Sequence, residues 1–181
     1  MPLIGIDVET TGFSPKTAGV IQVGIAWRAS HGRVCTWSEY CNPGRKYFAN
    51  NRAYWAMRFN KISMETVESA RSSKNVAKEL LERISVIELE MESPAVFKAY
   101  NSSFDQGFLS QKPWMLPAHK WGDCVMRDAA QKLVNKKRMK LSEAMRLLEI
   151  QWPGRAHDAM HDAHAALLVH EKLREKQPSP A

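Results

Sequence analysis

The stretch LIGIDVETTG, at residues 3–12, places two carboxylates in a pattern that otherwise reads as an apolar β-strand. Alternate side chains of a strand share a face, so Asp7 and Glu9 emerge together at the strand's end, while the isoleucines and Val8 point the other way. Thr10-Thr11-Gly12 then predicts a sharp turn. A strand end that simply meets solvent is the alternative explanation of the two acids.

Two further carboxylates, remote in sequence, have the same apolar or small-residue setting. Asp105 lies in AYNSSFDQGFL at residues 99–109, where an acidic residue that complements a helix N-terminus is the alternative. Asp162, in AHDAMHDAHAALL at residues 156–168, is the charged member of a helical stripe in steps of three and four. Small alanines in that stripe would let the helix approach the sheet closely. The other members of the stripe are Ala159, Ala166, Val169 and Leu173.

Four carboxylates in one place need compensating positive charge. Each pair would repel by ~4 kcal/mol at ~4 Å with an effective dielectric of ~20, and burial adds a desolvation cost. Divalent cations are the economical explanation. The sequence therefore predicts two Mg²⁺ ions, for which Mn²⁺ would substitute, among these carboxylates.

His157 is the candidate proton acceptor beside this constellation. It stands five residues before Asp162, about 140° away on a continuous helix, so it must precede the helix in order to face the same site. Pro153-Gly154 supports a loop there, and an imidazole with an ordinary pKa near ~6.5 suits removal of a proton from water. A free, exposed histidine is one alternative. The other is a zinc site on a helical face made by His157, His161 and His164.

The periodicity predicts an α/β domain in which strands come first and helices dominate later. A hairpin with a short turn predicts that the early strands are antiparallel, and the region from Asn42 to Lys61 reads as an irregular surface excursion. Ser102 or Ser103 is expected to cap the helix that carries Asp105. We expect one domain over residues 1–176 and a frayed tail over 177–181. The expected strands are 3–9, 20–28, 33–40 and 95–100, and the expected helices open at 63, cover 73–91, 124–134 and 141–149, and end with 158–176.

The bulk properties favour a nucleic-acid partner. A formal charge of +7 over 181 residues points to a negatively charged partner, and no apolar run is long enough for a membrane. Cys35, Cys41 and Cys124 are odd in number and lack metal-type spacing, which indicates reduced thiols in a cytoplasmic compartment. No signal peptide is recognisable at the N-terminus.

Aromatic and basic residues alternate between Arg45 and Lys61, a combination suited to single strands because rings stack on bases while cations hold phosphates. Packing of Trp55 and Phe59 into the core is the alternative. A second basic run, from Lys132 to Lys140, reads better as an ordinary solvated face.

The segments DVETTG, NSSFDQGFL and HDAMHD, together with WGDC and KLSEAMRLLEI, occur in an order and spacing that resemble the DEDDh exonuclease superfamily, the DnaQ-like group. The resemblance implies a ribonuclease H-like fold, with a mixed central sheet of about five strands flanked by helices. It also implies 3′-to-5′ hydrolysis that releases nucleoside 5′-monophosphates. By this likeness Asp7, Glu9, Asp105 and Asp162 are metal ligands and His157 is the general base. The terminal nucleotide would lie against Thr10, Thr11, Gly12, Phe13, Asn101 and Phe104.

Several points stay open at the level of sequence. Asn60-Lys61 stands where related sequences often have a histidine-glycine pair, so this chain departs from the family pattern at a position of expected substrate contact. The chain ends soon after the exonuclease motifs, which favours a free-standing enzyme, while a polymerase partner and a homodimer stay open. Choice between DNA and RNA, and a role in proofreading, DNA repair or RNA processing, are not readable. The competing functions are a nucleic-acid-binding module whose nuclease site is silent and a zinc hydrolase.

Overall fold

A four-stranded mixed sheet forms the centre of the protein. The computed structural model describes residues 1–49 and 51–175. The strand order is β3-β2-β1-β4, with β1 antiparallel to β2, β2 antiparallel to β3, and β1 parallel to β4. The antiparallel arrangement of the first three strands is therefore confirmed. The strands are β1 (Leu3–Thr10), β2 (Val20–Arg28), β3 (Val34–Tyr40) and β4 (Val96–Lys98).

The predicted number of about five strands is one too high for the described residues. Beyond these four strands, Trp121 forms an isolated parallel bridge with Phe97, and the Gly122 N–H donates to the Phe97 carbonyl at 3.0 Å. A short 3₁₀ helix, η2 (Ala118–Lys120), precedes this bridge, and the chain turns into a helix soon afterwards. The segment therefore touches the sheet edge without running along it.

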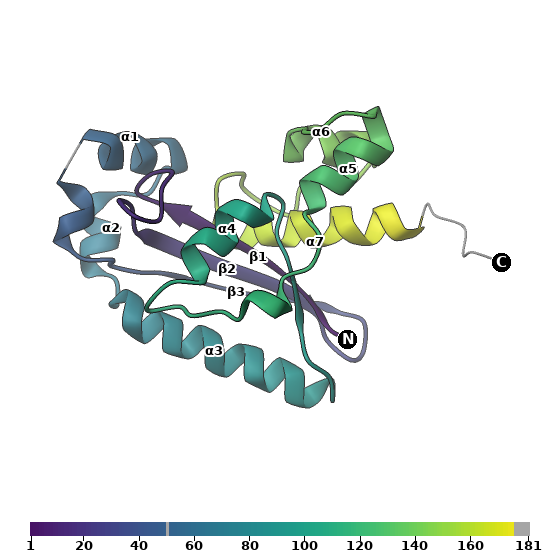
Figure 1. Ribbon diagram of the computed structural model, residues 1–181, viewed down its shortest axis with the longest axis horizontal. Helices are drawn as coiled ribbons and strands as arrows, with labels where there is room; N and C mark the ends of the chain where they lie inside the picture. The colour runs from purple at the N-terminus through teal and green to yellow at the C-terminus, as the bar shows by residue number, and fades with distance from the viewer. Residues whose placement is uncertain (50, 176–181) are drawn as a thin grey trace.

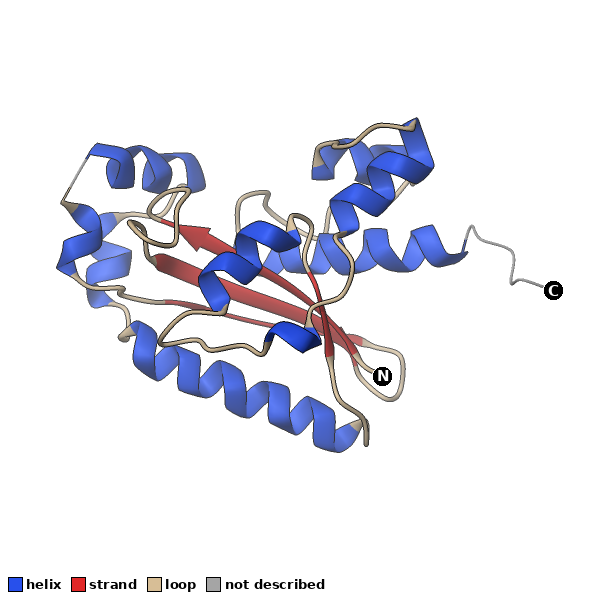
Figure 2. Ribbon diagram, in the orientation of Figure 1, coloured by secondary structure: helices blue, strands red, loops and turns tan. Residues whose placement is uncertain are grey.

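Helices cover both faces of the sheet (Figure 2). Figure 1 shows α1 and α2 at one end of the molecule and α5 and α6 beside α7 at the other. Among the described residues, no helix is long and apolar enough to cross a bilayer. The helical elements are η1 (Arg45–Phe48), α1 (Asn51–Asn60), α2 (Met64–Ser69), α3 (Ser73–Glu90), α4 (Ser102–Leu109), α5 (Val125–Val134), α6 (Leu141–Leu147) and α7 (Ala159–Glu175).

The stretch from Asn42 to Lys61, predicted to be irregular, contains η1 and α1, so that prediction is wrong. Ala53, Met57 and Asn60 are the buried residues of α1, at helical spacing. The stretch was misread because its aromatic and basic residues outnumber these three, and because the helix has no acidic residue in its first turn.

The main core lies between the sheet and α3. The strand residues that point away from Asp7 and Glu9, such as Ile4 and Ile6, pack in one cluster with Leu80 and Ile84 of α3. Burial of this apolar area is the main stabilising contribution, at roughly 25 cal/mol per Å². A second cluster joins α5, α6 and α7.

α7 lies against the other face of the sheet, at two glycines. A Cβ on Gly5 would meet the Ala163 carbonyl, and a Cβ on Gly24 would meet the Ala159 main chain. The predicted close approach of α7 to the sheet is therefore present. The small residues at the contact are Ala159 and Ala163, whereas Ala159 and Ala166 were expected. Ala166 instead packs toward α5 and α6 in the second cluster, because α7 has two buried faces rather than one stripe.

The cap of one helix differs from the prediction. Neither Ser102 nor Ser103 caps α4. Asn101 holds the N-cap position without a side-chain capping bond, and the Ser102 hydroxyl donates to the Ala99 carbonyl at 3.0 Å. α7 begins at Ala159 and is described as far as Glu175. The predicted helix end at Lys176 and the tail over 177–181 lie outside the described residues.

Candidate active site

Asp7 and Glu9 stand at the end of β1, on the face that meets α7, as predicted. Asp105 reaches the same strand from the first turn of α4, where its Oδ1 accepts a hydrogen bond from the Val8 N–H at 3.2 Å. Asp105 is 2% exposed and Glu9 8% exposed. The hydrogen bond fixes the Asp105 carboxylate against β1 at the residue between Asp7 and Glu9.

The first turn of α7 brings Asp162 to these carboxylates. Gln22 of β2 holds that turn, since its Oε1 accepts from the Ala159 N–H at 3.2 Å and its Nε2 donates to Asp158 Oδ2 at 3.3 Å. Because Gly24 allows the helix to lie directly on β2, Asp162 faces the end of β1.

Three of the predicted residues form a tight group. Glu9, His157 and Asp162 each offer a possible ligand atom, and these atoms all lie within 4.8 Å of one another. Asp7 and Asp105 lie outside this tight group but close enough to act on its charges. Asp162 Oδ1 is buried and has no hydrogen-bond partner, which is costly for a carboxylate oxygen unless a cation occupies its free side.

The electrostatics of the site are those of acids without compensating cations. Burial raises the pKa of Asp7 well above its usual range, and the charges of Asp105, Glu9 and Asp162 raise it further. Burial and then the Asp162 charge raise the pKa of Glu9 to about 8.

The pKa values of the two carboxylates carried by helices, Asp105 and Asp162, are raised as well. Burial raises the pKa of Asp105 to about 8, although the Val8 N–H opposes this shift. Burial also raises the pKa of Asp162 to about 6, against a main-chain contribution from His157. Oxygen ligands with this excess of negative charge fit a hard divalent cation.

His157 precedes α7, as predicted, in a loop where it adopts the left-handed conformation with φ 60°. Its ring lies against the ring of Phe59, with centroids 4.4 Å apart. Partial desolvation and then the Lys61 charge lower the pKa of His157. The lowered pKa favours the neutral imidazole, in which one ring nitrogen can accept a proton.

The alternative zinc face of three histidines does not form in the described part of the chain. His157 lies outside α7, so the three residues have no common helical face. His161 Nδ1 instead accepts from the Arg155 N–H at 3.2 Å and lies 3.4 Å from Asp158 Oδ1.

The predicted substrate residues after β1 form a turn held by its own hydrogen bonds. The Thr10 hydroxyl donates to the Gly12 carbonyl at 2.7 Å, and the Gly19 N–H donates to Thr11 Oγ1 at 2.9 Å. Both threonines are buried, so their side chains hold the turn. Phe13 is 93% exposed, which leaves its ring free to contact a ligand.

Asn101 and Phe104, predicted to contact the same nucleotide, lie at the start of α4. Asn101 is half-buried, and its carbonyl accepts from the Phe104 N–H at 2.8 Å. The Phe104 ring packs on Phe108, with centroids 5.1 Å apart. The structure therefore brings both residues to the helix that carries Asp105.

α1 carries exposed aromatic rings. Tyr54, Trp55 and Phe59 are 58%, 63% and 64% exposed. The alternative in which Trp55 and Phe59 pack into the core is therefore wrong. Phe59 links the aromatic face of α1 to His157.

With this geometry in place, the comparison with protein families is informative. The profile of the exonuclease family RNase_T matches residues 4–170, which include all five predicted catalytic residues. The chain belongs to this exonuclease family. The sequence resemblance to the DEDDh superfamily is thereby confirmed, and no curated protein sequence matched the chain.

Solved structures share the fold of this exonuclease at identities that show the fold alone. One, described as "3′-end specific recognition of histone mRNA stem-loop by 3′-exonuclease", has a TM-score of 0.77 and 15% identity over 97% of this chain and 64% of its own. The nuclease domain of 3′hExo, a DEDDh family member bound to rAMP, has a TM-score of 0.74 and 16% identity over 97% and 92% of the chains.

E. coli exonuclease I in complex with an oligonucleotide has a TM-score of 0.71 and 18% identity over 97% of this chain and 41% of its own. This exonuclease therefore spans less than two thirds of two of these three chains. The predicted ribonuclease H-like α/β fold is confirmed by the shared architecture.

Two residues of the exonuclease site were missed by sequence reasoning. Gln22 positions the start of α7, and the Asp158 charge raises the pKa of Asp7, Glu9 and Asp162. The signal for Gln22 was a lone amide in the apolar strand VIQVGIAW. Asp158 was visible as an acid at the expected start of the last helix, where its Oδ1 accepts from the Met160 N–H at 3.1 Å.

Proposed function

We propose that the protein is a divalent-cation-dependent exonuclease that hydrolyses single-stranded DNA or RNA from the 3′ end and releases nucleoside 5′-monophosphates. Membership of the exonuclease family sets the class of reaction. The observation that carries the finer proposal is the group in which Glu9, His157 and Asp162 offer ligand atoms within 4.8 Å of one another, where Asp162 Oδ1 is also buried without a partner.

The residues present fit a cation site. Asp7, Glu9, Asp105 and Asp162 would hold two Mg²⁺ ions, or Mn²⁺ in their place, since oxygen ligands suit both metals. When bound, such ions would acidify a water molecule and offset the negative charge that develops on the phosphate.

The chain's own groups account for the remaining chemistry. A nitrogen of the neutral His157 imidazole accepts a proton from the attacking water, which its lowered pKa permits at pH 7. The hydroxide so formed attacks the terminal phosphorus, and the bond to the 3′ oxygen of the preceding nucleotide breaks. Phe59 packs on one face of the His157 ring and so restricts its orientation during proton transfer.

The terminal nucleotide would lie between two elements that meet at Asp105. The main chain of Thr10, Thr11 and Gly12, with the Phe13 ring, would contact its sugar and base from one side. Asn101 and Phe104 would contact it from α4. The exposed rings and cations of α1 favour a single-stranded substrate, because unpaired bases can stack on Trp55 and Phe59.

The proposed arrangement is one exonuclease domain over residues 1–176, and its three free thiols fit a reducing, cytoplasmic compartment. A homodimer would be seen by sedimentation of the purified protein. The compartment and the oligomeric state do not affect the chemistry proposed for the carboxylates.

The test is product analysis on matched 3′-labelled DNA and RNA oligonucleotides, single-stranded and double-stranded, with Mg²⁺ and with chelator. We expect labelled nucleoside 5′-monophosphate from single strands with Mg²⁺ and none with chelator. Binding without release, in both Mg²⁺ and Mn²⁺, would show a silent nucleic-acid-binding module instead.

A further inference from the structure

A cavity of about 670 Å³ lies apart from the carboxylates. Its lining comes from the connection between β1 and β2, from η1, from the start of α3 and from the chain after α4. None of the four carboxylates of the site lines it. Figure 1 shows the chain after α4 running beside the first turn of α3, where one wall of the cavity lies.

The charge of the cavity is of one sign. Lys46, Lys74 and Lys112, from three separate segments, line it, and no aspartate or glutamate does. Other lysines form ion pairs with acids, as Lys78 does with Glu82 at 3.7 Å. Within residues 1–49 and 51–175 the three lining lysines have no such acidic partner, and Lys46 lies over the Tyr47 ring at 4.7 Å. An anion entering the cavity would meet three cations that no ion pair neutralises.

The cavity and the carboxylate site share two elements. α4 carries Asp105 in its first turn and Phe108, which lines the cavity, one turn later. The connection from β1 to β2 begins at Thr11 beside the site and lines the cavity at Pro15 and Gly19. Thr11 and Gly19 are joined by the Thr11 N–H to the Gly19 carbonyl and by the Gly19 N–H to Thr11 Oγ1, both at 2.9 Å. The spacing between the two sites is therefore fixed by hydrogen-bonded structure.

We propose that this lysine-lined cavity binds a backbone phosphate of the same strand whose 3′ end occupies the carboxylate site. The inference rests on the proposed function and names how the enzyme holds the strand upstream of the scissile bond. Lysine is a point charge that takes phosphate in many orientations, which suits a flexible single strand. The cavity would thus add affinity without reading sequence.

The proposal separates substrates by length. A dinucleotide has only its scissile phosphate, so it cannot place a second phosphate in the cavity, whereas a 12-nucleotide strand can. We would compare the wild type, the triple variant Lys46→Gln/Lys74→Gln/Lys112→Gln and a control, Lys78→Gln/Lys132→Gln/Lys172→Gln. The control removes equal charge from lysines that pair with acids outside the cavity.

The cavity variant should lower kcat/KM on the 12-mer by about tenfold or more at low salt, because each lost phosphate contact weakens single-strand binding. Its activity on the dinucleotide should stay within about twofold of the wild type, and the control should match the wild type on both substrates. The slope of log K against log salt for 12-mer binding, measured by fluorescence anisotropy in an Asp162→Asn background, should fall by about 0.7, the change expected when one single-strand phosphate is no longer neutralised.

Each other outcome is decisive. An unchanged 12-mer affinity and salt slope would overturn the cavity assignment while leaving the nuclease proposal intact. Equal losses on both substrates would also overturn it, since the lysines would then act on the scissile site. A wild type inactive on both substrates would remove the proposed function, while the salt slope would still test the cavity. If the triple variant does not fold, Lys74→Gln alone should lower the affinity for the 12-mer and leave activity on the dinucleotide within about twofold of the wild type. Weaker inhibition by a free nucleoside monophosphate, with strand binding unchanged, would assign the cavity to a free nucleotide and contradict the proposal.

Discussion

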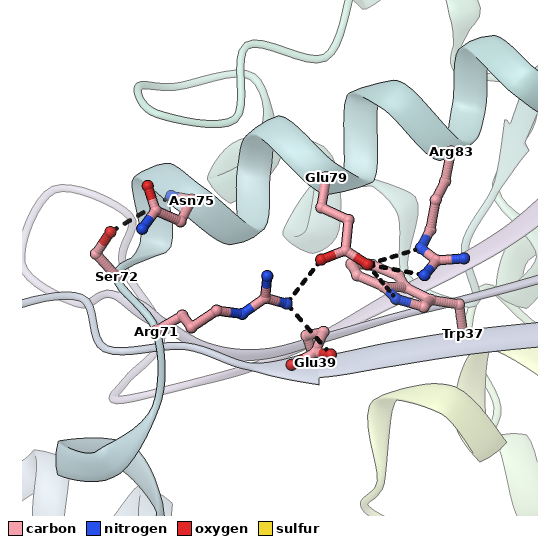
Figure 3. A network of polar contacts seen from close by, with 7 residues as sticks. All are labelled: Trp37, Glu39, Arg71, Ser72, Asn75, Glu79 and Arg83. Carbon is pink, nitrogen blue, oxygen red and sulfur yellow. Dashed lines mark hydrogen bonds and ion pairs between the residues drawn. The ribbon is translucent and has the colours of Figure 1, made fainter.

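Glu79 on α3 and the carboxylates beside β1 are two acidic regions with opposite surroundings. Glu79 accepts hydrogen bonds from Trp37 Nε1 at 3.1 Å, from Arg71 Nη2 at 2.7 Å and from Arg83 Nε at 3.0 Å (Figure 3). The bonds from Arg71 and then from Arg83 lower the pKa of Glu79. The chain itself supplies the positive charge that this acid requires.

The carboxylates at the end of β1 have no such support. Burial and mutual repulsion raise the pKa of Asp7, Glu9 and Asp162. In the described part of the chain, none of them forms an ion pair with a lysine or arginine, although the formal charge of the protein is +7. The difference shows where the protein leaves negative charge for a cation that the chain does not provide.

The largest expected effect comes from removing one charge of the uncompensated region. Asp162→Asn should lower nucleotide release by about 10³-fold, because it removes a proposed metal ligand from the reacting phosphate. At pH 8 without metal, the same change should raise the free energy of unfolding by about 2 kcal/mol, since it relieves repulsion and desolvation of a charge. Release rates from labelled oligonucleotides measure the activity, and denaturant melts measure the free energy of unfolding. Unchanged activity would contradict the claim that the carboxylates without ion-pair partners hold the metal.

His157→Ala should have the next largest effect, a fall of about 10²-fold in kcat, as expected for loss of a general base. The four carboxylates stay in place, so Mn²⁺ affinity should change little. The paired measurements are single-turnover rates and metal titration. Loss of metal binding in this variant would show that His157 is a ligand rather than the base.

The pH dependence of stability should follow the raised pKa values. In the folded protein burial raises the pKa values of Glu9 and Asp105 to about 8, from ordinary values of 4.5 and 3.8. The stability contributed by the protonated carboxyls is fully present below the ordinary pKa values of 4.5 and 3.8. It is lost as the pH rises toward the folded values of about 8. Metal-free protein should therefore lose about 2 kcal/mol or more between pH 5 and pH 8. Mg²⁺ should remove most of this loss, and thermal melts across pH with and without metal test the point.

The smallest expected effect is in the compensated region. Glu79→Gln should cost about 1 kcal/mol, a fall in Tm of about 2–4 °C, because its ion pairs are partly exposed and only the Trp37 bond is semi-buried. Nucleotide release should stay within about twofold of the wild type. A loss of activity as large as that of Asp162→Asn would remove the distinction between the two acidic regions.

Much of this contrast was readable from sequence, and the reasons are physical. Period-two alternation put Asp7 and Glu9 on one face, and the 140° displacement put His157 before α7, because both arguments use local geometry. Residues whose role depends on a distant partner were not readable. Gln22 looked like one polar side chain in a strand, and its hydrogen bonds reach Asp158 and Ala159 of α7.

Other misses share that cause. α1 was hidden because its buried face has only Ala53, Met57 and Asn60, and its burial comes from tertiary packing rather than from propensity. Ala166 lay in the predicted stripe, yet it faces α5 and α6, since the sequence does not say which of two neighbours a buried helical face meets. The expected count of about five strands was one too high, since the segment at Trp121 makes an isolated bridge in the described residues and pairing depends on the path of the chain outside it.

The most direct measurement is calorimetric titration of the metal-free protein with Mn²⁺ at pH 8, beside Asp7→Asn and Glu79→Gln. We predict saturable binding of two ions to the wild type and to Glu79→Gln, and weakened or lost binding to Asp7→Asn. No saturable binding to the wild type, or equal binding to all three proteins, would contradict the claim that these carboxylates form the cation site.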